Sequence, residues 1–337
     1  MDNIVNKKTQ VIIKKHKYFN PYLEDTKRKW FHYFLWQIGL YNDGIHLPLL
    51  PKDFSYPSPG NEVNISSPNV TWINHCTFLI QIDELTILTD PIWSKRCSPI
   101  SCIGPQRKHP SPIDIQNLPP VHIVLISHNH YDHLDVKSIK MLYQIFPNIL
   151  FIVPKGVKKW FTKKGITNVI ELSWWESQNI VLDQWLPAIK VTAVPAQHFS
   201  GRGLFDCNKT LWCGFIMDFF RKESGDKRLY FVGDTGYNSQ IFKEIGNNFK
   251  NIDLSLIPIG TYIPLRFMSP VHINPERAVL IHKEVESKMS IGMHWYTFRL
   301  SEEERLQPMY DLFLAMKESE LNPHFFRVLF PGQQINW

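Results

Sequence analysis

Four side chains that commonly bind metal ions fall within six positions of the sequence. They form the pattern His-x-His-x-Asp-His, made by His128, His130, Asp132 and His133. Three histidines and one aspartate at fixed places arise by chance in roughly one chain in a thousand of this length. Four ionisable groups so close together cannot all be buried without a shared partner. The pattern therefore predicts a metal site.

The spacing of these four residues indicates two metal ions. A tight loop turns side chains at alternate positions toward one point, so we expect His128 and His130 to bind one ion. Asp132 and His133 are expected to bind a second ion a few ångström away. Imidazole and carboxylate ligands suit Zn²⁺ or another first-row divalent ion. Four ligands are too few for two ions, so others must come from later in the chain.

Three later residues are candidates for the missing ligands. His198, Asp234 and His294 each follow a short apolar run and stand beside small or turn-forming residues. A lone histidine at the end of a strand is more often structural, with roughly a one-in-four chance of being a ligand. Together with the first cluster, these three complete the ligand set that two ions need.

The elements that must position these residues alternate between strands and helices, which predicts an α/β sandwich with helices outside two sheets. A Pro-rich connector separates an arm, residues 1–60, from a catalytic domain, residues 61–337. Strands are predicted at 70–74, 78–82, 85–89, 121–126, 189–194, 211–220, 229–232, 254–259 and 290–293, and helices at 28–42, 137–146 and 275–286.

Several longer motifs occur around these residues over about residues 65–310. They are VTWINHCTFLIQIDELTILTDPIWSKRCSP, ISHNHYDHLD, VIELSWWE, PAQHF, FVGDTGY, DLSLIPIGTY, VHINPERAVLIHKEV and GMHWYTFRLSEEE. Together they resemble the N-acylphosphatidylethanolamine-hydrolysing phospholipase D family of the metallo-β-lactamase superfamily. The resemblance implies an αβ/βα sandwich of two mixed β-sheets flanked by helices.

The resemblance also implies the ligands of two Zn²⁺ ions, with Asp234 bridging both. One ion would be bound by His128, His130 and His198, and the other by Asp132, His133 and His294. Asp132 and Asp234 would take part in catalysis. His272 matches a position near the substrate in this family, and a plain surface histidine is an equal alternative there.

The expected reaction is zinc-dependent hydrolysis of N-acylphosphatidylethanolamine to N-acylethanolamine and phosphatidate. Two divalent ions lower the pKa of a shared water toward ~7, and the resulting hydroxide attacks phosphorus in line. No Ser or Cys nucleophile is required. The alternative is a cytosolic metallo-hydrolase of a small phosphate ester or lactone. Processing of nucleic acid and a purely structural metal site are weaker alternatives.

Two positions depart from the family pattern. Asn74 and Tyr296 stand where glycine is usual, and a phenol at Tyr296 is expected to narrow the pocket beside His294. Asp90 and Asp135 are candidates to hydrogen-bond the metal-binding histidines. Formation of a turn after a strand explains those two aspartates equally well.

The positive charge is concentrated at the amino terminus. The net charge is +6, and residues 1–30 hold eight basic residues against three acidic ones. The body is nearly neutral, which excludes a protein that coats nucleic acid over its whole surface. An anionic membrane surface is the expected partner of the arm. The residues predicted to dock on membrane or substrate, with core packing or solvent exposure as alternatives, are Trp30, Phe31, Phe34, Arg107, Trp160, Phe161 and Tyr296.

The remaining features indicate a cytoplasmic, peripherally membrane-associated protein. No stretch of ~18 apolar residues and no apolar segment typical of a secretory signal is visible. Five scattered cysteines without a C-x-x-C pair are typical of reduced thiols. The expected partners are an N-acyl phospholipid and an anionic membrane, not nucleic acid, and a homodimer is left open.

Overall fold

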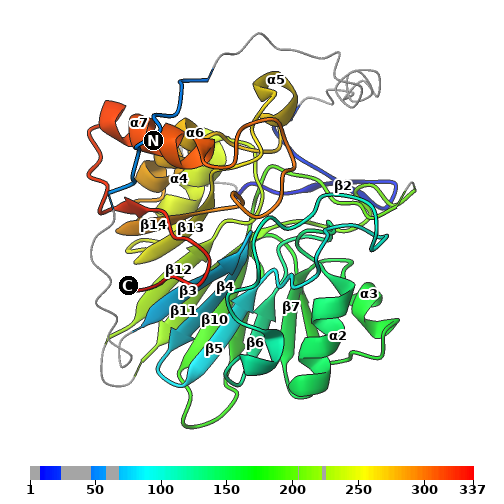
Figure 1. The fold of residues 1–337 in the computed structure, drawn as a ribbon. Helices are drawn as coiled ribbons and strands as arrows, with labels where there is room; N and C mark the ends of the chain where they lie inside the picture. The colour runs from blue at the N-terminus through cyan, green and yellow to red at the C-terminus, as the bar shows by residue number, and fades with distance from the viewer. Residues whose placement is uncertain (1–7, 24–46, 58–67, 204, 222–224) are drawn as a thin grey trace, which may run out of the picture.

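The computed structural model describes residues 8–23, 47–57, 68–203, 205–221 and 225–337. Within them, two seven-stranded β-sheets pack against each other, and helices cover the outer faces (Figure 1). This architecture confirms the predicted αβ/βα sandwich. The helix predicted at 28–42, with Trp30, Phe31 and Phe34, lies outside the described residues.

The first sheet has the strand order β16-β3-β4-β5-β6-β7-β8. It is antiparallel from β16 to β5 and parallel from β5 to β8. Both of its faces are covered, which explains why β3, β5 and β7 are buried along their whole length. The strands are β3 (Asn69–Asn74), β4 (Thr77–Ile82), β5 (Leu85–Thr89), β6 (Ile123–Leu125), β7 (Leu150–Pro154), β8 (Val169–Leu172) and β16 (Gln334–Asn336).

The second sheet has the strand order β15-β14-β13-β12-β11-β10-β9. It is antiparallel from β9 to β12 and parallel from β12 to β15. Each of the two sheets therefore has an antiparallel half and a parallel half. The strands are β9 (Ser177–Ile180), β10 (Ala188–Val194), β11 (Gly214–Phe220), β12 (Lys227–Phe231), β13 (Leu254–Pro258), β14 (Met289–Met293) and β15 (Phe326–Arg327).

Large aromatic side chains from both sheets fill the space between them. Trp72 and Phe78 from the first sheet join Phe215 and Phe231 from the second in one cluster, and all four are fully buried. Burial of a side chain of this size contributes roughly 1.5–3 kcal/mol relative to exposure. The two sheets are therefore held together as one body, which fixes the loops at their edges.

The helices lie outside the sandwich, with α2 and α3 on the first sheet and α4, α6 and α7 on the second (Figure 1). Asp135 caps α2 by accepting a hydrogen bond from the Ser138 N–H, and Asn274 caps α6 in the same way through the Arg277 N–H. The helices are α2 (Val136–Ile145), α3 (Lys158–Thr162), α4 (Ser239–Asn248), α5 (Leu265–Met268), α6 (Pro275–Glu284) and α7 (Gln307–Glu318), with one 3₁₀ turn at Ile115–Asn117.

The sequence pattern located most of the elements that surround the metal-binding loops. Each predicted strand overlaps an observed one, although β6 is only three residues long. The predicted helices at 137–146 and 275–286 correspond to α2 and α6. The prediction did not include β7, β8, β9, β15, β16, α3, α4, α5 or α7, nor the strands β1 (Ile12–Lys14) and β2 (Lys17–Phe19) of the amino-terminal segment.

Part of the basic arm packs on the catalytic body as a hairpin of β1 (Ile12–Lys14) and β2 (Lys17–Phe19). The Thr9 N–H donates to Oε1 of Glu244 at 2.9 Å, which ties the start of this segment to α4. The Asn20 amide donates to the His198 carbonyl at 2.7 Å, which ties its end to a predicted metal ligand. No helix within the described residues has the length and hydropathy to cross a bilayer.

Candidate metal centre

Seven ligand-type side chains from loops of both sheets converge at one edge of the sandwich. They lie in four segments that follow β6, β10, β12 and β14. The edge at the carboxyl ends of strands is the usual place for a site in α/β folds. The seven are the residues that the sequence predicts, namely His128, His130, Asp132, His133, His198, Asp234 and His294.

One group within this cluster consists of three imidazoles. His128 Nε2 lies 2.8 Å from His130 Nδ1, and His198 Nε2 lies 3.3 Å from the same atom. The side chains of His128 and His198 are buried. Three converging ring nitrogens are the protein ligands of many zinc sites.

The second group combines two carboxylates with two imidazoles. His133 Nε2 lies 3.2 Å from Oδ2 of Asp132 and 3.2 Å from Oδ2 of Asp234. His294 Nε2 lies 3.5 Å and 3.1 Å from the same two oxygens. This mixture of nitrogen and oxygen donors suits Zn²⁺ and other borderline divalent ions.

Asp234 lies between the two groups. Its Oδ2 is 3.8 Å from His128 Nε2 and 3.7 Å from His198 Nε2, in addition to the two shorter distances in the second group. Its other oxygen, Oδ1, is buried and makes no hydrogen bond, and the same holds for Nε2 of His133 and of His294. Buried polar atoms without partners are rare in proteins. Two cations at this place would satisfy all three atoms, so the residues present fit a dinuclear metal centre.

The electrostatics divide the buried histidines into two kinds. Burial, reinforced by neighbouring imidazoles, lowers the pKa of His128 well below the ordinary value, and burial does the same for His198. Burial also acts on His294, but the Asp234 carboxylate outweighs it and raises the pKa of His294 to about 9. His133 behaves like His294 because Asp234 and Asp132 raise its pKa. A cation that binds between these imidazoles and the carboxylates must therefore displace protons.

The outer nitrogens of three histidines in the cluster, His133, His198 and His294, have partners that fix their rings. Asp90 Oδ2 lies 2.7 Å from His133 Nδ1 and also accepts from Ser127 Oγ. The Val271 carbonyl lies 2.9 Å from His198 Nδ1, and Thr261 Oγ1 lies 3.1 Å from His294 Nδ1. Such partners orient the inner nitrogens and raise their basicity. Asp90 thus supports the centre, whereas Asp135 caps α2.

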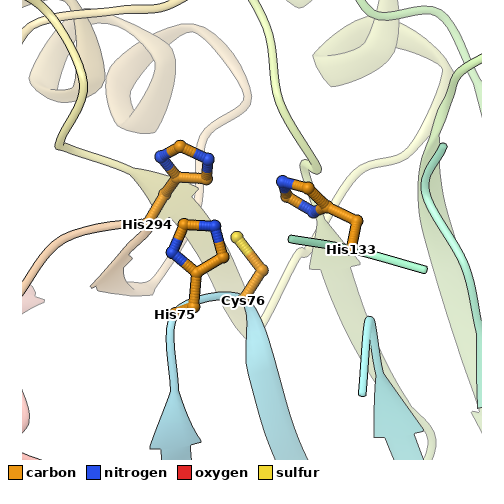
Figure 2. Close-up of side chains that lie close together, drawn as sticks. All are labelled: His75, Cys76, His133 and His294. Atoms are coloured by element: carbon orange, nitrogen blue, oxygen red, sulfur yellow. The ribbon is translucent and has the colours of Figure 1, made fainter. Parts of the chain in front are cut away.

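His75 is a component of the site that the sequence did not predict. It lies in the two-residue turn between β3 and β4, and its Nε2 is 2.9 Å from Oδ2 of Asp132. Its carbonyl accepts the His294 N–H at 3.1 Å, so one residue contacts two members of the second group. Figure 2 shows its ring beside those of His133 and His294. Because His75 is a single histidine far from the cluster in the sequence, no sequence pattern indicated that it belongs to the site.

Arg202 is a second component that the sequence did not predict. Its guanidinium donates to the carbonyls of Asn129 at 2.8 Å and Leu134 at 2.7 Å, at the two ends of the metal-binding loop. It also stacks on the Tyr131 ring, 3.9 Å from the ring centroid. These contacts hold the loop in the conformation that brings its side chains together.

The other predicted catalytic residue, His272, also joins the cluster. Its Nδ1 lies 3.9 Å from Oδ2 of Asp234, and its ring centroid is 5.2 Å from that of His198. Its side chain is 13% exposed, so it lies at the partly exposed edge of the cluster.

The residues predicted to dock on lipid lie in different environments. Phe161 is fully buried against Phe151, so it is not available to a membrane. Its predicted role in docking was wrong, because the short helix α3 turns the Phe161 ring into the core. Trp160 is half-buried beneath Lys164. One nitrogen of the Arg107 guanidinium, Nη2, donates to the carbonyls of Trp93 and Ser94.

Tyr296 lines a cavity of about 250 Å³ that reaches His294. Its φ of 64° lies in the left-handed region that favours glycine. The Arg305 guanidinium covers its ring at 3.5 Å from the centroid. The cavity is lined by Lys108, Thr261, His294, Trp295, Tyr296, Phe298, Arg299, Leu300, Ser301, Glu303, Glu304, Arg305 and Pro308.

Comparisons with known proteins agree with this geometry. Residues 86–295 match the beta-lactamase superfamily domain. The chain is 40% identical over 233 residues to Caenorhabditis elegans N-acyl-phosphatidylethanolamine-hydrolyzing phospholipase D 1, covering 68% of this chain and 64% of that protein. It is 37% identical over 267 residues to the mitochondrial N-acyl-phosphatidylethanolamine-hydrolyzing phospholipase D of Saccharomyces cerevisiae, covering 79% and 54%.

Solved structures share the fold at lower identity. Igni18, a metallo hydrolase from Ignicoccus hospitalis, has a TM-score of 0.57 at 20% identity and covers 80% of this chain and 98% of its own. The chain spans less than two thirds of the length of the nematode and yeast phospholipases. On the match of its domain, the chain belongs to the beta-lactamase superfamily, and over most of its length it is similar to the N-acyl-phosphatidylethanolamine-hydrolyzing phospholipases D of nematode and yeast.

Proposed function

We propose that the protein is a dinuclear zinc phosphodiesterase that hydrolyses N-acylphosphatidylethanolamine to N-acylethanolamine and phosphatidate. The observation that supports it best is the position of Asp234, whose Oδ2 lies within 4 Å of ring nitrogens from both donor groups. One ion would be bound by His128, His130 and His198, the other by Asp132, His133 and His294, with Asp234 shared. The names of the nematode and yeast relatives supply the substrate class.

When bound, two divalent ions would activate water as a nucleophile and neutralise charge on the phosphodiester. Asp132 is positioned by His75 to orient the attacking water, because their 2.9 Å contact fixes the carboxylate. His272 lies at the partly exposed side of the cluster, where it can protonate the leaving alkoxide oxygen. Because water is the nucleophile in the proposed reaction, no serine or cysteine nucleophile is needed.

The β1–β2 hairpin is proposed as one membrane contact. Ile13 is 63% exposed, and Lys14, Lys15 and Lys17 lie beside it around the hairpin turn. Near an anionic leaflet each lysine is worth ~1 kcal/mol. Because Asn20 links this hairpin to the His198 carbonyl, docking there would place the metal centre close to the bilayer surface.

The test is identification of products from purified, zinc-loaded protein. We expect N-acylethanolamine and phosphatidate from vesicles of N-acylphosphatidylethanolamine, detected by mass spectrometry, and no product after chelation. Soluble phosphodiesters and lactones serve as competing substrates in the same assay. Turnover of those compounds without any release from N-acyl phospholipids would sink the proposal and leave the small-substrate hydrolase in its place.

A further inference from the structure

A cysteine lies among the imidazoles of the second metal group. Cys76 follows His75 in the turn between β3 and β4, and Figure 2 shows its sulfur between the rings of His75 and His133. Sγ of Cys76 and one ring nitrogen each of His75, His133 and His294 all lie within 4.8 Å of one another. All four residues are buried. One thiol and three imidazoles form a donor set of the kind that binds zinc.

Two of the imidazoles in this donor set each keep one ring nitrogen for a cation. Nδ1 of His133 is occupied by Asp90, and Nδ1 of His294 is occupied by Thr261. The remaining nitrogen of each, Nε2, is buried, makes no well-aligned hydrogen bond and lies 3.1–3.5 Å from Oδ2 of Asp132 and of Asp234, where a cation would take the place of a proton. A cation between these two nitrogens is therefore within reach of the Cys76 sulfur as well as of the Asp132 and Asp234 carboxylates.

All five cysteines are free thiols, and this placement distinguishes Cys76 from the other four. Cys213 is equally buried but belongs to none of the donor groups found within the described residues. Cys97 is buried against Ile92 and Phe298, and Cys102 and Cys207 are exposed. Burial alone therefore does not explain the position of Cys76.

We infer that Cys76 is a ligand of the second metal ion. The bond would form between the sulfur and the cation as the thiol proton leaves to solvent, so no oxidant or reductant is needed. A thiolate is a soft donor that favours Zn²⁺ over hard ions such as Mn²⁺ or Mg²⁺. Cys76 would then set the metal preference of the site. The inference rests on the dinuclear centre proposed above but not on the lipid substrate.

The experiment is X-ray absorption spectroscopy at the zinc edge of the full chain loaded with two zinc ions. We expect a sulfur scatterer at ~2.3 Å, at about half a sulfur per zinc because only one of the two ions is bound to it. The Cys76→Ala variant should lose this scatterer and should release one zinc at roughly tenfold lower chelator concentration. The matched control Cys213→Ala removes an equally buried thiol and should keep both properties.

The outcomes separate this inference from the proposed function. A wild-type spectrum with nitrogen and oxygen ligands only would overturn the role of Cys76, whether or not the protein hydrolyses lipid. That result is obtained without any variant, so it holds even if Cys76→Ala fails to fold. A protein that binds no zinc would overturn the dinuclear centre together with this inference.

Discussion

At the residue scale, the convergence of the side chains in the candidate centre could be predicted from sequence because their spacing is improbable by chance. His128, His130, Asp132 and His133 stand within six positions, and three later residues stand at strand ends. His75 could not be found in this way. It reaches Asp132 across 57 positions, and nothing in its neighbourhood distinguishes it from a structural histidine. Contacts between residues so distant in sequence exist only once the sheets have packed.

Asp234→Asn tests the shared carboxylate. The amide keeps the shape of the side chain but removes the charge that five imidazoles face. We therefore expect turnover of N-acylphosphatidylethanolamine to fall by at least ~100-fold and zinc content to drop below two per chain. Zinc analysis and steady-state kinetics measure the two effects. Asp83→Asn, a change of the same kind at a surface ion pair, is the control. Full activity of Asp234→Asn would contradict a shared ligand.

His75→Ala tests the contact with Asp132. Loss of the imidazole removes the 2.9 Å contact that fixes the Asp132 carboxylate. We therefore expect zinc affinity and kcat to fall by roughly 10–100-fold. His75→Asn should recover part of the loss, because an amide also donates a hydrogen bond and asparagine tolerates the φ of 45° at this position. His324→Gln, on the surface, is the control for zinc titrations. Equal behaviour of the alanine and asparagine variants would mean that His75 acts through packing alone.

At the scale of elements, predicted strands were reliable where apolar runs end in turn-forming residues. LTILT followed by Asp90 is an example, and it corresponds to β5 from the first residue to the last. Strand β9, SQNI, was missed because three of its four residues are exposed, and a polar strand at the edge of a sheet has no apolar pattern to detect. Helix α3 was missed because it has only five residues.

Charge neutralisation of the hairpin tests its proposed membrane contact. Lys14→Gln, Lys15→Gln and Lys17→Gln together remove about 3 kcal/mol of attraction to an anionic leaflet, so binding to anionic vesicles should weaken roughly 100-fold. Turnover of detergent-dispersed substrate should not change. Vesicle co-sedimentation gives the first quantity and a micellar assay the second. Deletion of the whole segment would be less informative, because it also removes the contact between Thr9 and Glu244.

The control for the hairpin variant is a triple change of equal charge on the side of the molecule that carries α4 and α6. It replaces Lys243, Lys283 and Lys288 by glutamine. If both triple variants lose vesicle binding equally, the attraction depends on net charge, and the hairpin has no special part in it.

At the scale of the whole molecule, stability without metal should depend on pH in two opposite ways. The pKa of His294 is about 9, above the ~6.5 of an unfolded histidine, so its stabilising effect is present below pH ~6.5 and is lost as the pH rises toward 9. This shift corresponds to about 3 kcal/mol. Burial lowers the pKa of His75 to about 4, so its neutral ring favours the folded state increasingly from pH 4 to ~6.5. Chelator-treated protein should therefore be most stable near pH 6.5.

Thermal denaturation across pH 4–9 measures this profile. Zinc-loaded protein is the comparison, because bound cations replace the proton on His294 and should flatten the decline above pH 6.5. A melting temperature that rises continuously from pH 6.5 to 9 in the metal-free protein would show that the pair of His294 and Asp234 does not control stability.

The overall architecture could be predicted from sequence, but the place of the amino-terminal segment could not. Strands and helices have local patterns, and their alternation indicated the sandwich. Residues 8–23 are held by contacts such as Thr9 with Glu244, 235 positions apart, which no local pattern encodes. A basic composition predicted an arm, whereas the structure shows a hairpin that is hydrogen-bonded to the body.

The division of the ligands between the sheets has a consequence for how the protein is made. Four of the seven candidate ligands follow β6 in the first sheet, and three follow strands of the second. During synthesis the loop with three histidines leaves the ribosome before Asp234 and His294 have been translated. The full donor set can exist only after the last strands of the second sheet have joined the sandwich. Tight zinc binding would then report that folding is complete, and fragments ending before β14 would bind zinc weakly.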